Sequence, residues 1–144
     1  MSVSEDQIKR IIFSNARTFN DWKKKDIPNK ILEDLYNLMK FGPTSANCSP
    51  SRIIFIKSEE AKNRLKPFII ESNLNKTMTS PVTAIIAFDI DFHKYLPKLF
   101  PHDPDAQNWF NYSQDVAETN AFRNSSTVSY THLTLPTTGV VEWS

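Results

Sequence analysis

The stretch that decides the fold is Gly42-Pro43-Thr44-Ser45-Ala46-Asn47-Cys48-Ser49-Pro50, followed closely by the apolar run Ile53-Ile54-Phe55-Ile56. Its prolines restrict the backbone, while its hydroxyl, amide and backbone N–H groups are hydrogen-bond donors. The stretch can therefore present a stiff set of donors to the polar edge of a flat heterocycle. Taken alone, a capped helix end with turn-forming residues is the simpler interpretation.

Two helices are predicted before this loop. Ser4 and Gln7 fit a capping box, and isoleucines recur after them at helical spacing, so the first helix extends to about Asn15. A second helix has Pro28 in its first turn and ends near Gly42, where a left-handed residue is expected. The apolar face of the second helix consists of Ile31, Leu35, Leu38 and Met39.

Two apolar runs, Ile53 to Ile56 and Val82 to Phe88, predict strands that are buried on both faces. Ser58 begins a short helix that extends to about Lys66. Further elements are predicted along the rest of the chain: a helix from Asp91 to Phe100 that Pro97 kinks or ends, a loop from Pro101 to Asn108, and more helix from about Ser113.

Composition narrows the function classes. The chain has 144 residues, 40% of them hydrophobic, which suits one compact domain. Seventeen basic against 16 acidic residues leave a net charge of +1, which argues against nucleic acid or a membrane surface as partner. The N-terminus lacks the pattern of a signal peptide, so we expect a cytoplasmic protein. One cysteine and three scattered histidines predict no metal site, and two glycines exclude a dinucleotide-binding G-x-G-x-x-G turn.

The chain changes character after Ser126. Residues 128–137, Val-Ser-Tyr-Thr-His-Leu-Thr-Leu-Pro-Thr, are rich in β-branched residues without a turn or a partner strand. They resemble the translation of a transposase sequencing adapter, since GTC TCT TAT ACA CAT CTG ACG CTG CCG ACG encodes them in order. We therefore expect residues 1–126 to be the N-terminal part of one domain and residues 127–144 to be a non-native tail. An ordinary C-terminal strand is the alternative.

Three segments together resemble the nitroreductase superfamily. That family places an Arg-Ser/Thr pair after its first helix, a Pro-Ser/Thr-Ser-x-Asn loop after its second, and an Asn and a Lys before a buried strand. The corresponding segments in this chain are Ala16 to Trp22, Gly42 to Pro50 and Asn73 to Met78. Within the superfamily the resemblance is strongest to the malonic semialdehyde reductases (3-hydroxypropionate dehydrogenases) of pyrimidine degradation, on strings such as Leu99-Phe100-Pro101-His102 and Ala121 to Ser126.

The resemblance implies a set of FMN-binding residues. Arg17 matches the arginine that binds the phosphate, a role for which the planar guanidinium is suited. Thr44, Ser45 and Asn47 match the loop that lies against the isoalloxazine, reached across a homodimer interface, and Asn73 and Lys76 match groups at its pyrimidine edge. The complete implied set is Arg17, Thr18, Asn20, Pro43, Thr44, Ser45, Asn47, Asn73 and Lys76.

Each of these assignments has a plainer alternative. Arg17 and Lys76 also fit solvated surface charges, and Asn20 stands where many members of the superfamily carry a second basic residue. Cys48 lies inside the loop, but no histidine is near it in the sequence and the family's chemistry needs no thiol. Core packing is the simpler role for the aromatic side chains Trp109, Phe110 and Tyr112. The resemblance names no catalytic side chain, because the flavin carries the hydride.

The resemblance further implies an α+β, three-layer nitroreductase-like fold, with helices around a mixed sheet, that is incomplete at the C-terminus. The implied protein is a homodimeric FMN-dependent oxidoreductase that uses NADH or NADPH to reduce malonic semialdehyde to 3-hydroxypropionate. The shortened chain itself is expected to be inactive. Two alternatives stay open: a reductase of nitroaromatics or quinones, and a truncated polypeptide that binds no cofactor.

Overall fold

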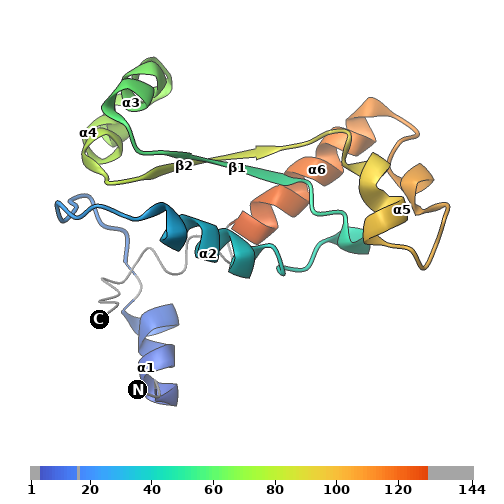
Figure 1. The fold of residues 1–144 in the computed structure, drawn as a ribbon, viewed down its shortest axis with the longest axis horizontal. Coiled ribbons are helices and arrows are strands. Elements are labelled where there is room, and N and C mark those ends of the chain that lie inside the picture. The colour runs from blue at the N-terminus through green and yellow to red at the C-terminus, as the bar shows by residue number, and fades with distance from the viewer. Residues whose placement is uncertain (1–3, 16, 130–144) are drawn as a thin grey trace.

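The computed structural model describes residues 4–15 and 17–129 (Figure 1). Helix α1 (Glu5–Lys9) continues into a π-helical turn (Arg10–Ser14), and α2 (Asn29–Met39) follows after an irregular segment. The central elements are a 3₁₀ turn (Ser45–Asn47), β1 (Ser51–Ile56), α3 (Glu59–Leu65), a 3₁₀ turn (Lys66–Phe68), α4 (Glu71–Thr79) and β2 (Thr83–Phe88). The remaining elements are a 3₁₀ turn (Phe92–Tyr95), α5 (Leu96–Leu99), a 3₁₀ turn (Ala106–Trp109) and α6 (Gln114–Val128).

The two strands form an antiparallel ribbon that organises the molecule. Ser51 pairs with Phe88 at one end of the ribbon and Ile56 pairs with Thr83 at the other. Helices α3 and α4 connect the strands at the Ile56 end, while the loop after α2 and helix α5 lie at the Ser51 end (Figure 1). The predicted α+β fold is confirmed. The sheet was expected to be mixed, but within residues 4–15 and 17–129 it has this one antiparallel pair.

The strands are less buried than predicted. Side chains of β1 alternate between exposed and partly buried positions, and Ile54 is 55% exposed. The expectation of burial on both faces is therefore wrong for β1. The physical reason is that α6 packs across both strands, so that alternate β1 side chains point away from the interior.

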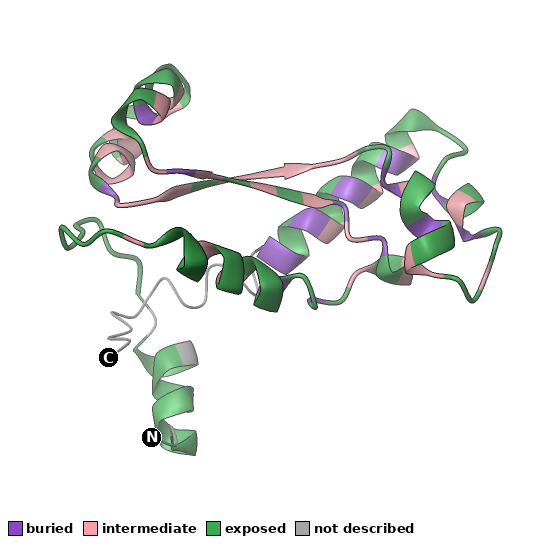
Figure 2. Ribbon diagram, viewed as in Figure 1, coloured by how far each residue is buried: buried purple, intermediate pink, exposed green. Residues whose placement is uncertain are grey.

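The core lies at the Ser51 end of the ribbon. Buried side chains gather on α6 and around α5 (Figure 2). They form one cluster of Cys48, Phe92, Leu96, Ala106, Phe110 and Ala121. By contrast, the predicted apolar face of α2 is mostly exposed: Met39 is buried, but Ile31 and Leu38 are not, because the described residues provide no surface that covers them.

Local signals in the sequence locate the starts of three helices. The capping box of Ser4 and Gln7 is confirmed, and Ser58 and Ser113 cap α3 and α6 through their hydroxyl groups. The left-handed conformation predicted for Gly42 is wrong, since no glycine of the described chain has a positive φ. Pro97 does not end a helix; it lies in the first turn of α5, where its missing N–H is not needed.

Three elements differ from the expected pattern. Helix α4 was not predicted, because Ile70 gives it no side-chain cap and its apolar periodicity is weak. A 3₁₀ turn interrupts the expected loop from Pro101 to Asn108. Helix α6 continues two residues beyond Ser126, and Val128 is buried, so packing overrides the β preference of this residue. The rest of the predicted tail, 130–144, lies outside the described residues.

None of the helices in the described part of the chain is long and apolar enough to cross a lipid bilayer.

Candidate functional site

The loop between α2 and β1 has an unusual backbone. Ala46, Asn47 and Ser49 have φ values of 49°, 51° and 40°, although none of them is a glycine. Left-handed conformations are costly for residues with a Cβ atom and persist only where surrounding contacts impose them. The loop is therefore held in shape by its neighbours, as expected for a rigid binding element.

Hydrogen bonds from two helices impose this shape. The Ser45 N–H donates to Oδ1 of Asn124 in α6 at 2.8 Å, and Nδ2 of Asn47 donates to the Leu99 carbonyl at the end of α5 at 2.9 Å. Inside the loop, the Ser49 N–H donates to the Thr44 hydroxyl at 3.1 Å. Pro43, Ser45 and Asn47 are nevertheless exposed. The loop is therefore held by α5 and α6 on one side and open to solvent on the other.

Cys48 is the buried anchor of this loop. Its side chain is 1% exposed and belongs to the core cluster. Burial raises the pKa of the Cys48 thiol to about 11, because the thiolate would lose its hydration. A neutral, enclosed thiol is a poor nucleophile, which agrees with the expectation that Cys48 has no chemical role.

The second group of predicted site residues lies on α4. Asn73 and Lys76 are partly buried there. The indole Nε1 of Trp22 donates to the carbonyl oxygen of Lys76 at 2.7 Å, which attaches the irregular segment before α2 to this helix. Lys57, just after β1, attaches the same segment to the end of that strand, since its ammonium donates to the Ile27 carbonyl and lies 3.3 Å from the carboxylate of Asp26.

Arg17, Thr18 and Asn20 precede Trp22 in this segment. All three are exposed. Because Trp22 contacts α4, the segment that ends at Trp22 is attached at the same end of the ribbon as Asn73 and Lys76 (Figure 1). The structure therefore links two of the three segments that the sequence singled out.

The third segment, the loop, lies at the opposite end of the ribbon. The loop leads into Ser51, whereas α4 leads into Thr83, which pairs with Ile56. Six residues of extended strand separate the two ends, a distance of about 20 Å. One chain therefore does not bring all the predicted residues to one place.

Three residues that shape the loop carry no signal in the sequence. Arg52, Asp89 and Asn124 hold it or its flanks through hydrogen bonds and an ion pair. An arginine two residues after a Pro-rich loop belongs to no motif that would mark it. Asp89 becomes its partner because the two strands pair. The signal that could have found them is the register of the two strands, which a single sequence does not state.

The aromatic residues before α6 divide into two groups. Phe110 is buried and meets Phe92 edge to face, with ring centroids 5.3 Å apart, so core packing is confirmed for it. Trp109 is 47% exposed and Tyr112 74% exposed, so core packing is wrong for these two. The Trp109 ring still meets the Phe100 and Phe110 rings, with centroids 6.0 Å and 6.4 Å away, so it is covered on one side only.

A surface groove and the distribution of metal-binding side chains also bear on possible sites. A shallow groove of about 700 Å³ runs between α2 and β1, lined by residues that include Tyr36, Ile54 and Lys57. No group of three or more His, Cys, Asp or Glu side chains in the described part of the chain could hold a metal ion.

Comparison with known proteins defines the fold. No known family profile matches the chain. Among solved structures, it superimposes on a protein of Exiguobacterium sibiricum that is assigned to the nitroreductases and was solved in complex with FMN, with a TM-score of 0.77 at 18% identity. The match covers 93% of this chain and 70% of that one. The chain therefore has the nitroreductase fold and spans about seven tenths of that relative's length.

Two other similar structures show how widely the fold is used. A protein of Staphylococcus epidermidis assigned as an NAD(P)H:FMN oxidoreductase matches with a TM-score of 0.70 at 17% identity, over 86% of this chain and 65% of its own. CLA-ER, an enone reductase of gut-bacterial fatty acid saturation, matches with a TM-score of 0.74 at 14% identity, over 92% and 71%. The fold is thus compatible with several reducible substrates.

Proposed function

We propose that this chain is the N-terminal part of a homodimeric, FMN-dependent NAD(P)H oxidoreductase. The observation that carries the proposal is the separation of the candidate residues at opposite ends of one ribbon, in a chain with the nitroreductase fold. A second copy of the chain can bring its loop to the α4 end of the first copy. The two groups then line one shared site.

The donor set suits FMN. The guanidinium of Arg17 would hold the phosphate through paired, charge-assisted hydrogen bonds, with Thr18 and Asn20 beside it. The Ser45 hydroxyl is exposed, and Asn47 keeps one N–H and its side-chain oxygen after bonding Leu99. Pro43 and Thr44 keep these two groups in place. When bound, FMN supplies hydride transfer between a nicotinamide and a substrate.

Asn73 and Lys76 would bind the pyrimidine edge of the flavin. Reduction places negative charge at this edge, and a fixed ammonium or amide donor stabilises it. The Trp22 indole holds the Lys76 backbone, so the side chain that carries the ammonium group is anchored at a fixed position. In this arrangement Lys76 tunes the cofactor rather than transferring a proton itself.

The substrate we propose is malonic semialdehyde, reduced to 3-hydroxypropionate, on the strength of the subfamily strings in the sequence. Nitroaromatic, quinone and enone compounds are the competing substrates for this fold. Specificity is a ratio of kcat/KM values, so all four classes must be compared with the same enzyme and the same nicotinamide.

Titration with FMN tests the cofactor assignment. The full-length counterpart of this chain should bind FMN, turn yellow and dimerise, and Arg17→Ala should weaken FMN binding by about 1.5–3 kcal/mol through loss of a charge-assisted contact. Arg64→Ala, on the exposed side of α3, is the control. A colourless protein that takes up no FMN would contradict the proposal, and binding without any preference for the aldehyde would contradict the substrate alone.

A further inference from the structure

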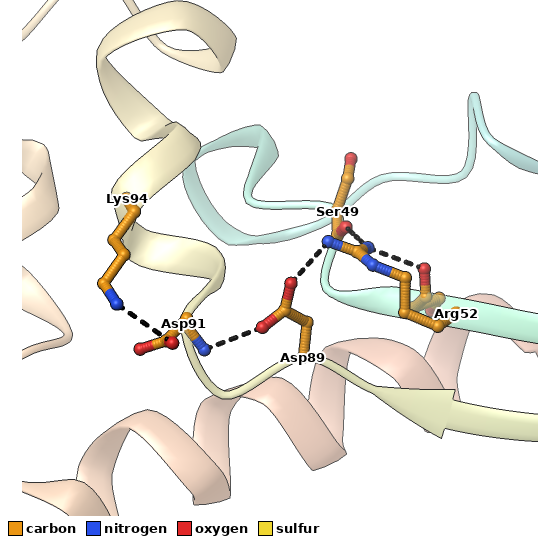
Figure 3. Close-up of polar contacts among 6 residues, drawn as sticks. Ser49, Arg52, Asp89, Asp91 and Lys94 are labelled. Atoms are coloured by element: carbon orange, nitrogen blue, oxygen red, sulfur yellow. Dashed lines mark hydrogen bonds and ion pairs between the residues drawn. The ribbon is translucent and has the colours of Figure 1, made fainter.

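A set of side-chain contacts that no sequence motif predicts supports the strained loop. The positive φ of Ser49 lies at the point where the loop joins β1, and the conformation needs support at that residue. Figure 3 shows the Arg52 guanidinium beside this junction, with main-chain carbonyl groups at the start of β1 on one side and the Asp89 carboxylate after β2 on the other.

Arg52 supports the junction from three sides. Its Nη1 donates to the Ser49 carbonyl at 3.2 Å and to the Ser51 carbonyl at 2.9 Å, and its Nη2 lies 2.7 Å from Oδ2 of Asp89. The group also lies 6.0 Å from the centre of the Tyr95 ring. A planar fork of donors serves carbonyl groups and a carboxylate together in fixed directions.

Asp89 is itself fixed to both sides of the junction. Its N–H donates to the Pro50 carbonyl at 3.0 Å, and its Oδ1 accepts the N–H of Asp91 at 2.9 Å (Figure 3). Asp91 in turn pairs with Lys94 at 2.9 Å. These bonds fix the position of the Asp89 carboxylate after β2, and this carboxylate in turn orients Arg52 against the loop.

We propose that Arg52, oriented by Asp89, is a positioning residue that keeps Ser45 and Asn47 in the geometry that binds the cofactor. This inference rests on the proposed function. The Arg52–Asp89 pair is partly exposed, with 45% and 24% of the two side chains accessible, so it adds little to the stability of the whole chain. Its effect falls on the loop, which is strained and close to it.

Hydrogen exchange without FMN tests the positioning step directly. The N–H groups of Asn47, Cys48 and Ser49 are bonded inside the loop, so their exchange reports its shape. Arg52→Ala should accelerate exchange at these amides about tenfold or more and leave the middle of β1 unchanged. Arg52→Lys keeps the charge but loses the fork, so it should accelerate exchange nearly as much.

FMN titration of the same variants tests the consequence. Arg52→Ala and Arg52→Lys should raise the Kd for FMN about tenfold and shift the visible spectrum of bound flavin, while the control Arg64→Ala should change neither. Unchanged loop exchange, or faster exchange with an unchanged Kd and spectrum, would overturn the inference and leave the proposed function standing. A wild-type protein that binds no FMN would overturn both.

Discussion

The two ends of the β-ribbon are held by different forces. At the Ser51 end, an apolar cluster built on Cys48, Phe92 and Leu96 underlies the loop. At the Ile56 end, a polar contact takes its place: the buried ammonium of Lys62 in α3 donates to the Met78 and Ser80 carbonyls at the end of α4. Helices α3 and α4 at this second end carry exposed and partly buried residues with few buried ones (Figure 2).

The difference shows which part of the proposed site one chain completes. The loop has its core, its helix contacts and its ion pair within the chain, so its shape does not depend on a partner. Arg17, Thr18 and Asn20 are exposed, and the Trp22 indole attaches their segment to α4. We infer that one chain completes the loop end, whereas the proposed site at the α4 end needs the loop of a second copy.

The largest expected effect is at the core beneath the loop. Phe92 is fully buried, so Phe92→Ala should lower the free energy of unfolding by about 3–5 kcal/mol through lost burial and a cavity. Urea denaturation measures the change. Phe68 is 82% exposed, and Phe68→Ala should change stability by no more than about 0.5 kcal/mol. Equal losses in the two variants would mean that the core is not where we place it.

The next effect concerns the thiol at the same end. With the pKa of Cys48 at about 11 against an ordinary 9.0, its thiolate at pH 8 is about 100-fold scarcer in the folded chain. Reaction with a disulfide reagent should be slower by at least that factor than in urea. Rapid labelling of the folded protein would show that the loop end opens.

The same pKa gives a pH dependence. Folding keeps the Cys48 thiol neutral, so its contribution to stability is complete below pH 9 and is lost as the pH rises through about 11. Other groups titrate in this range, so the difference between the wild type and Cys48→Ala isolates the thiol. That difference should shrink as the pH rises, and a difference that stays constant would contradict the assignment.

The smallest of these effects is expected at the α4 end. Burial lowers the pKa of Lys62, and its ammonium is retained by the carbonyls that it caps. Lys62→Met keeps most of the stem but leaves these acceptors unpaired, which should cost about 1–3 kcal/mol of stability. Lys66→Met, at an exposed position just after α3, is the matched control. No loss in Lys62→Met would mean that apolar packing alone holds this end.

Much of the local structure could be predicted because its signals are local. Serine caps at Ser4, Ser58 and Ser113 begin helices, and two apolar runs become the strands. Predictions that depended on packing were less successful. Gly42 has no positive φ, whereas Ala46, Asn47 and Ser49, which carry no such local signal, do.

The sequence by itself determined which residues are candidates for the proposed site: the loop Pro43 to Asn47, the guanidinium of Arg17, and the pair Asn73 and Lys76. Only the tertiary structure decided where they lie. Strand pairing joins Arg52 to Asp89 across 37 positions of the chain, and the same pairing sets the loop and α4 at opposite ends of the ribbon. The sequence gives the residue type at each position. The distance between two residues depends on long-range contacts, which no local sequence pattern predicts.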